Sequence, residues 1–515
     1  MNIFKMIFSR IVIFGLILVI QVVWLVDVLL NLQSYSTVAS SILTVLSLLV
    51  TLYIVYKDGN PAYKLAWIVP ILVFPVFGGL LYLAMGNKKP PKKYRRAIKQ
   101  LKADPQLAMP QNEGVMEKIK EASLSTYGQT NYISKVAGYP IYKNEYSKYY
   151  PIGEEYYEDL IVELKKAKHF IFMEYFIVEE GEMFDRILEI LYLKAKEGVD
   201  VRFMYDDVGS VSILPYGYAK RLERKGIKCI AFNPFVPFLS VAMNNRDHRK
   251  ITVIDGHTAF TGGINLADEY INAKVRFGHW KDTGIRVRGQ AVWNFTVMFL
   301  RMWNINRITD TEFAKFGPEV YRHEMKLEKD EEPDYGYIQP YGDSPTDDEI
   351  TGENVYLNII NMAVRYVYIF TPYLIVDHEM ITAITLAAKR GVDVRIVTPG
   401  IADKKIVNEV TKSYYPILLQ AGAKIYEYTP GFLHAKCVVC DDEIATVGTI
   451  NMDFRSLYLH FENGVYLYKT KTVADIKADM LHTMNVSESI TYEMTEKGRA
   501  FGIVRAILRL FAPLM

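Results

Sequence analysis

The sequence predicts an α/β protein in which N-terminal transmembrane helices precede two similar lobes. From about residue 111 onward, apolar runs typical of β-strands alternate with helical ones. Two segments of this region occur twice: residues 195–202 return at 388–395 with seven of eight residues identical, and residues 171–178 return at 369–376 with five of eight. The offsets of 193 and 198 residues indicate a domain of roughly 190 residues that is duplicated, with pseudo-twofold symmetry between the copies.

The composition excludes several classes of protein. A chain of 515 residues is too long for a lone small binding module. Lys and Arg total 60 and Asp and Glu total 58, so the net charge is only +2 and any basic surface must be local. Hydrophobic residues make up 50% of the chain, which excludes intrinsic disorder and fits a membrane-attached globular protein. Three cysteines cannot build a disulfide scaffold, and Cys437 and Cys440 lie on a predicted strand where i and i+3 face opposite sides, so no zinc or redox site is expected.

Residues 1–86 are predicted to be a membrane anchor with two or three crossings. They hold three long apolar stretches, 11–30, 38–56 and 65–86, and the only charge within these is Asp27. Each stretch is long enough to span about 30 Å of hydrocarbon. A cleaved secretory signal is the alternative for the first stretch, but no small-residue cleavage site follows it.

Residues 87–125 are predicted to be a basic linker next to the membrane. Eight Lys and Arg lie between residues 88 and 102. The positive-inside rule therefore places the following lobes on the cytoplasmic side of the cell membrane. Basic residues at this position also attract anionic lipid head groups, at roughly 1 kcal/mol each.

The loop before the third stretch complicates this topology. Lys57 and Lys64 draw that loop to the same side as the basic linker, which conflicts with a full crossing by the third stretch. Pro70, Pro75 and the pair Gly78 and Gly79 interrupt this stretch, so a broken or re-entrant segment would resolve the conflict. An N-terminus on the outside is the other resolution.

The remaining chain divides into a first lobe at 126–325, a linker at 326–348 and a second lobe at 349–515. The linker is acidic and contains prolines and glycines. At the C-terminus, Arg505 and Arg509 lie one helical turn apart among apolar side chains. This pattern predicts an amphipathic helix, which lies either on the membrane surface or against the second lobe.

The strongest functional signal is a set of residues that each lobe carries once. The set comprises a histidine, a lysine two residues later, an aspartate, a glycine and an asparagine, and every pair is separated by 186 residues. The candidate residues are His248, Lys250, Asp255, Gly262, Gly263 and Asn265 in the first lobe, and His434, Lys436, Asp441, Gly448, Thr449 and Asn451 in the second.

The residue types predict a phosphoryl-transfer site. Residues i and i+2 of a strand share one face, so each histidine points the same way as its lysine. An ammonium repels a metal cation but steadies a phosphoryl anion, so neither a metal nor a cofactor is expected. Neutral imidazole acts as nucleophile or proton carrier, and two of them in one site divide these roles if the lobes meet.

The other members of the set are expected to support this chemistry. Asp255 and Asp441 lie beyond the strand ends, where an ion-pair or orienting role is expected. Asn265 and Asn451, with Gly263 and Thr449 beside the paired glycines, would allow close backbone approach and provide an amide donor for the phosphate.

The chain resembles the phospholipase D superfamily, whose H-x-K-x-x-x-x-D signature both lobes match. It is most similar to bacterial cardiolipin synthases, through the segments NPAYKLAW, NRDHRKITVIDG, GGINLADEY, HWKDT, TPYLIVD, GFLHAK and GTINMDFRS. The resemblance implies two lobes, each a mixed sheet flanked by helices. It also implies that one histidine becomes phosphatidylated, that the other acts as acid and base without a metal, and that two phosphatidylglycerols give cardiolipin and glycerol.

Carried onto this chain, the resemblance implies roles for further residues. Either His248 or His434 attacks phosphorus, and we favour His248. Lys250, Lys436, Asn265 and Asn451 would bind the phosphate oxygens, whereas Asp282 of HWKDT and Glu462 of HFENG would orient the two imidazoles. The chain departs from the family pattern in its first apolar stretch, in His460 where Asn is usual, and in Gly263 and Thr449 where Ser is common.

The leading hypothesis is a membrane-bound phosphatidyltransferase that acts on phosphatidylglycerol and membrane lipid. A phospholipase D hydrolase would use the same residues with water as acceptor. The apolar segments count against a nuclease, so no nucleic-acid partner is expected, and the intact His and Lys pairs count against an inactive lipid-binding scaffold. The sequence leaves open the donor lipids and whether the chain forms an oligomer.

Overall fold

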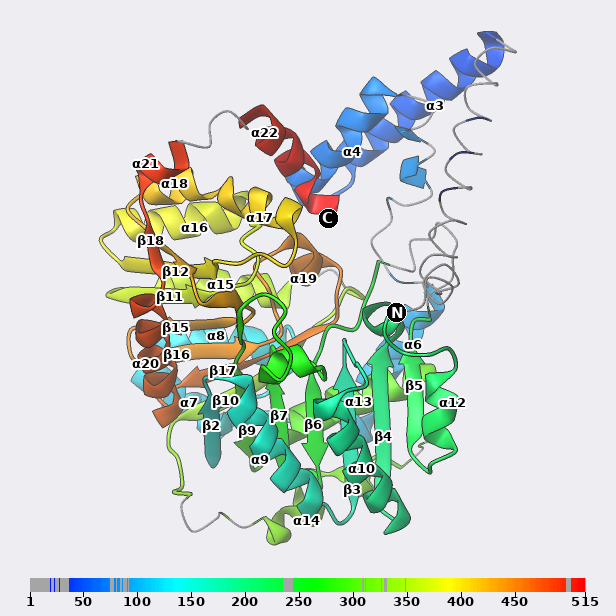
Figure 1. Cartoon of the computed structure of the whole chain (residues 1–515), viewed down its shortest axis with the longest axis vertical. Coiled ribbons are helices and arrows are strands. Elements are labelled where there is room, and N and C mark those ends of the chain that lie inside the picture. The colour runs from blue at the N-terminus through cyan, green and yellow to red at the C-terminus, as the bar shows by residue number, and fades with distance from the viewer. Residues whose placement is uncertain are drawn as a thin grey trace.

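The protein is described from a computed structural model of the whole chain, and its core is built from two large sheets (Figure 1). The structure describes residues 37–514 together with residues 19, 23 and 27, apart from gaps at 75–77, 80, 84–85, 87–89, 91, 235–243, 308–309, 311, 326, 328–330, 348 and 497–501.

The first sheet has seven strands in the order β2-β9-β7-β6-β3-β4-β5. The strands β3, β4 and β5 are parallel and the other pairs are antiparallel, so the sheet is mixed. Its strands are β2 (Tyr146–Tyr150), β9 (Gly284–Arg288), β7 (Thr258–Gly262), β6 (Ile251–Ile254), β3 (Phe170–Tyr175), β4 (Asp200–Asp206) and β5 (Lys228–Phe232). The main helices of this lobe are α9 (Gly153–Lys166), α10 (Glu182–Lys196), α12 (Tyr218–Glu223) and α13 (Val292–Asn306).

The second sheet repeats this arrangement in nine strands, in the order β1-β10-β17-β16-β15-β11-β12-β13-β18. Its strands are β1 (Tyr142–Lys143), β10 (Tyr337–Asp343), β17 (Glu462–Tyr468), β16 (Ile444–Gly448), β15 (Cys437–Cys440), β11 (Tyr366–Phe370), β12 (Asp393–Pro399), β13 (Lys424–Tyr428) and β18 (Glu488–Ile490). The helices of this lobe include α15 (Thr351–Met362), α16 (His378–Lys389), α17 (Lys405–Lys412), α18 (Tyr415–Gln420), α19 (Phe454–Tyr458) and α20 (Lys471–Asn485). The run β17-β16-β15-β11-β12-β13 has the same order and directions as β9-β7-β6-β3-β4-β5, which confirms the predicted duplication.

The repeated sequence 195–202 forms the same chain reversal in both lobes. In the first lobe α10 ends at Lys196 and β4 begins at Asp200, with Gly198 at φ +92° between them. In the second lobe Gly391, at φ +93°, separates α16 from β12. A positive φ is the conformation that glycine adopts without strain, so both copies keep glycine there.

The two lobes meet along a shared apolar core and a small additional sheet. One continuous cluster of buried side chains includes Phe172 and Val253 from the first sheet and Val439 and Leu467 from the second. In addition, β8 (His279–Lys281) of the first lobe pairs in parallel with β14 (Gly431–Leu433) of the second. The segment predicted to be a linker at 326–348 is partly regular, because β10 within it joins the second sheet.

The N-terminal region forms a helical hairpin that extends from the lobes at the upper right of Figure 1. It consists of α3 (Thr37–Tyr56) and α4 (Pro61–Val73), which contact each other through Val50, Ile54, Trp67 and Ile71. The second predicted stretch coincides with α3, and α4 ends three residues after Pro70. Among the described residues, no helix combines the length and apolarity that a membrane crossing requires. Nearly all of the first predicted stretch, 11–30, lies outside the described residues.

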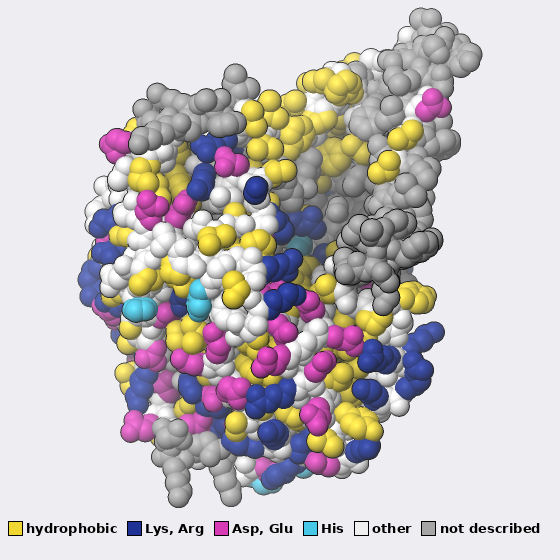
Figure 2. Space-filling model, viewed as in Figure 1, with side chains coloured by type: hydrophobic (Ala, Val, Ile, Leu, Met, Phe, Trp, Pro, Cys, Tyr) yellow, Lys and Arg dark blue, Asp and Glu magenta, His cyan; other side chains and the backbone are white. Residues whose placement is uncertain are grey.

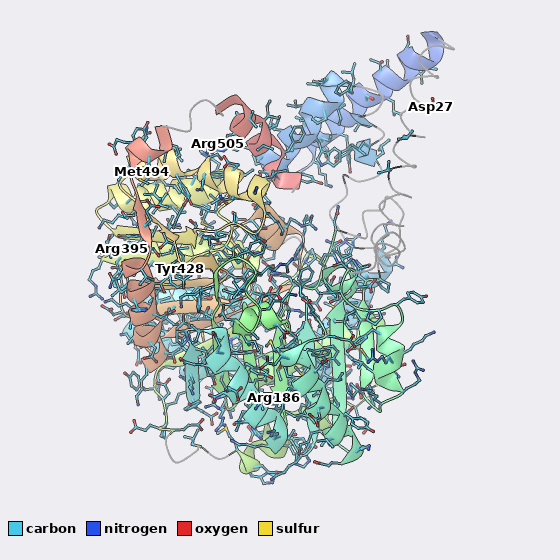
Figure 3. All side chains as sticks on the ribbon, viewed as in Figure 1. Asp27, Arg186, Arg395, Tyr428, Met494 and Arg505 are labelled. Carbon is cyan, nitrogen blue, oxygen red and sulfur yellow. The ribbon has the colours of Figure 1, made fainter. Side chains whose placement is uncertain are left out.

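The two segments expected near the membrane are both helical. The basic linker contains α6 (Lys92–Lys102), which packs against α13 of the first lobe. The C-terminal helix α22 (Gly502–Phe511) lies beside α17, where Arg505 (Figure 3) forms an ion pair of 2.8 Å with Glu409. Both predicted arginines face the second lobe, since Arg509 stacks over the ring of Tyr414 at 4.3 Å.

Candidate functional site

The candidate site is a cavity of about 690 Å³ between the two lobes. His248 and His434 both line it, together with Asn265 and Asn451. The duplicated histidines therefore share one cavity, which is the arrangement that a division of roles between them requires.

The strands β6 and β15 position the histidine and lysine pairs. Each pair lies in the extended segment immediately before its strand, and all four side chains are buried. Lys250 Nζ donates a hydrogen bond of 2.6 Å to the backbone oxygen of His248, and Lys436 binds the backbone oxygen of His434 in the same way. Each ammonium is thereby fixed beside its own histidine.

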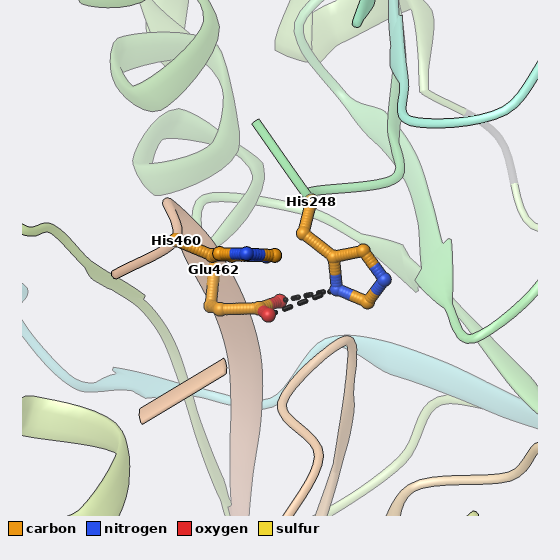
Figure 4. A group of neighbouring side chains, drawn as sticks. All are labelled: His248, His460 and Glu462. Atoms are coloured by element: carbon orange, nitrogen blue, oxygen red, sulfur yellow. Dashed lines mark hydrogen bonds and ion pairs between the residues drawn. The ribbon is translucent and has the colours of Figure 1, made fainter. Parts of the chain in front are cut away.

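Each imidazole is held by a carboxylate from the opposite lobe. His434 Nδ1 lies 2.6 Å from Asp282 Oδ2, and His248 Nδ1 lies 2.8 and 3.0 Å from the two oxygens of Glu462 (Figure 4). The backbone of each histidine also contacts the opposite lobe, because His248 N donates to Phe461 O and His434 N donates to Lys281 O. The structure thus brings together both histidines, both lysines and both carboxylates named from the sequence.

Burial sets the protonation of the imidazoles. It lowers the pKa of His434 to about 4, with the neighbouring Lys436 as the next cause. Burial and Lys250 likewise hold the pKa of His248 well below its usual range. Both imidazoles are therefore neutral near pH 7, and a neutral imidazole that donates Nδ1–H to a carboxylate leaves its Nε2 lone pair available for reaction.

The two carboxylates have different surroundings. Glu462 also accepts hydrogen bonds from Ser456 Oγ at 2.5 Å and from the Thr449 hydroxyl, and burial raises its pKa to about 8. Asp282 accepts from Thr283 N at 2.8 Å, and the residue that corresponds to Thr449 is Gly263, which has no hydroxyl. A Cβ on Gly263 would lie 2.0 Å from Asp282 Oδ1, so glycine is needed for the carboxylate to fit.

The structure shows which protein groups Gly263 and Thr449 contact. The sequence predicts that both bind substrate phosphate. In the structure, the missing side chain of Gly263 leaves room for the Asp282 carboxylate, and the Thr449 hydroxyl donates a hydrogen bond to Glu462. Spacing within one lobe could not reveal this, since the partner carboxylates lie 13 or more residues away along the chain.

Asp255 and Asp441 each bind backbone groups at the start of a strand. The carboxylate of Asp255 accepts the backbone N–H groups of residues 168, 169 and 170, each at 2.8 Å, where β3 begins. Asp441 does the same for residues 364, 365 and 366 at the start of β11. Both aspartates have a left-handed backbone, with φ of +50° and +51°. They therefore hold a turn against the neighbouring strand and do not orient the imidazoles.

The two asparagines border the cavity and differ in how many hydrogen-bond partners their amides have. Asn265 Oδ1 accepts from Ile177 N at 3.0 Å and its Nδ2 donates to Tyr270 Oη at 2.8 Å, so both its amide oxygen and its amide nitrogen have a partner. Asn451 Oδ1 is buried without a hydrogen-bond partner among the described residues. Asn451 therefore differs from Asn265, because its amide oxygen has no hydrogen-bond donor among the described residues.

His248, His460 and Glu462 form a cluster whose potential ligand atoms lie within 4.8 Å of one another (Figure 4). The group fits a metal ion poorly. Glu462 already accepts three hydrogen bonds, and His460 Nε2 accepts one of 3.3 Å from Arg455 Nε. Nearby Lys250 would in addition repel a cation.

Sequence reasoning assigns no site role to three residues that line the cavity, namely Arg246, Arg455 and His460. Arg246 and Arg455 lie within segments that carry the family resemblance, and His460 is a departure from it. Their position beside the histidines could have been suspected from these segments, but not their mutual arrangement.

The fold and the site together define a two-lobed phospholipase D-like phosphoryl-transfer protein. The family described as "Cardiolipin synthase, PLD-like domain" matches residues 160–288 and again residues 356–484, and the family "Phospholipase_D-nuclease N-terminal" matches residues 42–87. The chain belongs to the bacterial cardiolipin synthase family of the phospholipase D superfamily, and it is a phosphatidyltransferase.

Individual relatives cover almost the whole chain. A cardiolipin synthase of Alkalihalophilus pseudofirmus is 34% identical over 94% of this chain and 95% of its own length. An uncharacterized protein of Streptococcus mutans is 45% identical over 90% of this chain and 99% of its own. Among solved structures, the phosphatidylserine synthase of Haemophilus influenzae matches 75% of this chain and 100% of its own with a TM-score of 0.57 and 13% identity, which supports the fold alone.

Proposed function

We propose that the protein joins two phosphatidylglycerols into cardiolipin and glycerol through a phosphohistidine at His248. The observation that carries this proposal is the pair of neutral imidazoles in one cavity, each hydrogen-bonded through Nδ1 to a carboxylate of the opposite lobe. This geometry provides one nucleophile and one proton carrier for a two-step displacement at phosphorus.

In the first step, His248 Nε2 attacks the phosphorus of one phosphatidylglycerol. The P–O bond to the head-group glycerol breaks, and His434, which takes up a proton at Nε2 when the anionic phosphodiester binds beside it, donates that proton to the departing oxygen. In the second step, His434 takes a proton from the hydroxyl of a second phosphatidylglycerol, whose oxygen attacks phosphorus and breaks the P–N bond. The products are cardiolipin and glycerol, and both histidines return to their starting state.

The assignment of the two histidines rests on the difference between their carboxylates. A proton carrier becomes imidazolium during the cycle and needs a partner that stabilises positive charge. Asp282 lies 2.6 Å from His434, whereas Glu462 has a raised pKa and its oxygens are shared among three donors. His434 is therefore better suited to carry the proton, and His248 to attack.

The lysines would bind the oxygens of the reacting phosphate, with Asn451 as a further amide partner. Burial lowers the pKa of Lys250 to about 7 and that of Lys436 to about 8. A bound phosphodiester is an anion, so it favours the ammonium form of both lysines and strengthens its own binding.

This linkage predicts that substrate binding weakens with rising pH. Between about pH 7 and about pH 9 the lysines of the free protein lose protons, so binding must restore them, and the Kd for a short-chain phosphatidylglycerol should rise about tenfold or more. Calorimetry in buffers of different ionisation enthalpy should show proton uptake on binding. A Kd that stays constant over this interval would contradict the role of the lysines.

The reaction itself is tested by incubating detergent-purified protein with labelled phosphatidylglycerol and following lipid products and glycerol together. Cardiolipin and glycerol in equal amounts are expected. Phosphatidic acid with glycerol would instead show that the protein is a hydrolase. Binding of phosphatidylglycerol without any conversion would support the alternative of an inactive lipid-binding scaffold.

We also propose that the N-terminal hairpin attaches the lobes to the cell membrane as part of a multi-pass anchor, with the lobes on the cytoplasmic side. Hydrophobic side chains are exposed along α3 and α4, and Figure 2 shows them gathered over this part of the molecule. These include Ile42, Val45, Leu49 and Leu52 of α3, Leu65 and Leu72 of α4, and Val504 and Ile507 of the adjacent α22. An apolar surface of this extent is typical of a membrane or protein contact.

The attachment predicts that the protein stays in the membrane pellet after an alkaline carbonate wash. The lobes should also resist protease added to intact spheroplasts, because they lie on the inner side. Release by high salt alone would contradict an apolar anchor, and cleavage of the lobes from outside would contradict the proposed side.

The division into lobes at 126–325 and 349–515 remains part of this proposal. It is supported by the two sheets and by the two matched segments, 160–288 and 356–484. The strand β10 at Tyr337–Asp343 extends the second lobe into the predicted linker.

A further inference from the structure

The cavity has a strongly cationic end that the two-histidine reaction does not use. Arg246, Arg455 and His460 line it on the side of His248. Since Lys250 and Lys436 already lie beside the reacting imidazoles, this end is available for a second group. The inference below rests on the proposed transfer between two lipids.

Arg246, one of these residues, has a guanidinium nitrogen that is unused among the described residues. The side chain is 1% exposed, its Nε and Nη2 bind Asp206, and Nη2 also donates to the backbone oxygen of Asn233. Its Nη1 is buried without a hydrogen-bond partner among the described residues. A buried guanidinium N–H without an acceptor is unfavourable, so this atom is suited to a ligand.

Arg455 adds a cation that forms no direct ion pair with a carboxylate within the described part of the chain, although Asp453 lies near enough to act on its charge. Among the described residues, its guanidinium makes one hydrogen bond, of 3.3 Å, from Nε to His460 Nε2. Burial lowers the pKa of Arg455, the charge of Asp453 opposes this, and the positive charge of Arg246 lowers the pKa further. Both guanidiniums line the same cavity, so they lie near each other. Like charges at close range are unfavourable until an anion lies between them.

His460 fixes the orientation of this arginine. Burial, and next the charge of Arg455, hold the pKa of His460 well below its usual range, so the ring is neutral and accepts the Nε–H. The ring of His460 lies 5.7 Å from that of His248 between centroids (Figure 4). An anion on Arg455 would therefore lie within the reach of a lipid head group from the proposed phosphohistidine.

We propose that Arg246 and Arg455 form a second phosphate subsite, which binds the unreactive phosphodiester of the acceptor phosphatidylglycerol. Bound there, the acceptor directs its free glycerol hydroxyl toward the phosphorus on His248. The subsite selects an acceptor that carries its own phosphate, and it thereby favours a second lipid over water or free glycerol. His460 is the residue that positions Arg455.

The test compares two reactions of the full-length protein that share the donor half. One is cardiolipin formation, which needs the acceptor phosphate, and the other is exchange of labelled glycerol into phosphatidylglycerol, which does not. Arg455→Met keeps the length of the side chain and removes the charge. Its rate of cardiolipin formation should fall at least about tenfold more than its rate of exchange, with the loss in the KM for acceptor, because a charged hydrogen bond is lost.

Two further variants sharpen the comparison. Arg455→Lys retains the charge and should recover part of the lost cardiolipin formation, which a merely structural role would not predict. Arg186→Met on the exposed face of α10 (Figure 3) is the matched control and should change neither reaction. The unfolding temperature of each variant reports whether the fold has been kept.

The failing outcomes are distinguishable. If the wild type forms cardiolipin but Arg455→Met slows both reactions equally, the subsite proposal alone is wrong. If the wild type exchanges glycerol and forms no cardiolipin, phosphatidylglycerol is not the acceptor. Both the proposed function and the proposed acceptor subsite are then wrong. If inorganic phosphate inhibits both reactions through Arg455 while the acceptor KM does not depend on this residue, the subsite binds a free anion and the lipid assignment is overturned.

Discussion

His248→Ala and His434→Ala should each lower cardiolipin formation by about 10⁴-fold or more, because each removes one of two groups that act as a unit. Both histidines border the cavity and are otherwise buried. The rate of cardiolipin formation from labelled phosphatidylglycerol measures the loss. His482→Ala, on the exposed side of α20, is the matched control and should retain full activity.

The same variants identify the nucleophile if the donor carries a leaving group that needs no proton. With a nitrophenyl ester of phosphatidic acid, His434→Ala should release a burst of nitrophenol, because His248 attacks and the phosphohistidine then persists. His248→Ala should give no burst. The reverse pattern would exchange the two roles, and full cardiolipin formation by either variant would overturn the two-histidine mechanism.

Much of the fold follows from local signals that the sequence contains twice. The glycine at 198 and its counterpart at 391 end a helix and lead into a parallel strand, so the two copies can be aligned through their amino-acid sequences alone. The offset of 186 residues between His248 and His434 then indicates two equivalent lobes. What this offset cannot show is how the lobes face each other.

The limits of the sequence reasoning arise at contacts between segments that are distant in the chain. The spacing of Asp255 from His248 gives no sign that its carboxylate binds the backbone at the start of β3. Likewise, nothing within one lobe shows that Glu462 crosses to His248, and only the family resemblance predicts Asp282 and Glu462 at the imidazoles. The cluster of Arg246 and Arg455 depends on one loop and on α19, which only the folded cavity brings together.

The crossed carboxylates predict a second large effect, which should differ between the two lobes. Asp282→Asn keeps the size of the side chain but removes the charge that stabilises protonated His434. Its kcat should fall by about 10²- to 10⁴-fold, since an amide also disfavours the productive tautomer. Glu462→Gln should cost at least about tenfold less, because the amide oxygen can still accept the Nδ1–H of His248, which carries no transferred proton in the proposed cycle.

The contrast between these variants separates catalysis from packing, since both carboxylates are fully buried and each joins the two lobes. Asp185→Asn and Glu189→Gln, on the exposed face of α10, are matched controls for the two chemical changes. The pH profile of kcat provides a readout that packing would not move: its alkaline limb should shift to lower pH in Asp282→Asn, where the pKa of His434 loses the carboxylate that raises it. Equal losses in both variants would show that the carboxylates serve mainly to hold the lobes together, and a greater loss in Glu462→Gln would transfer the proton-carrying role to His248.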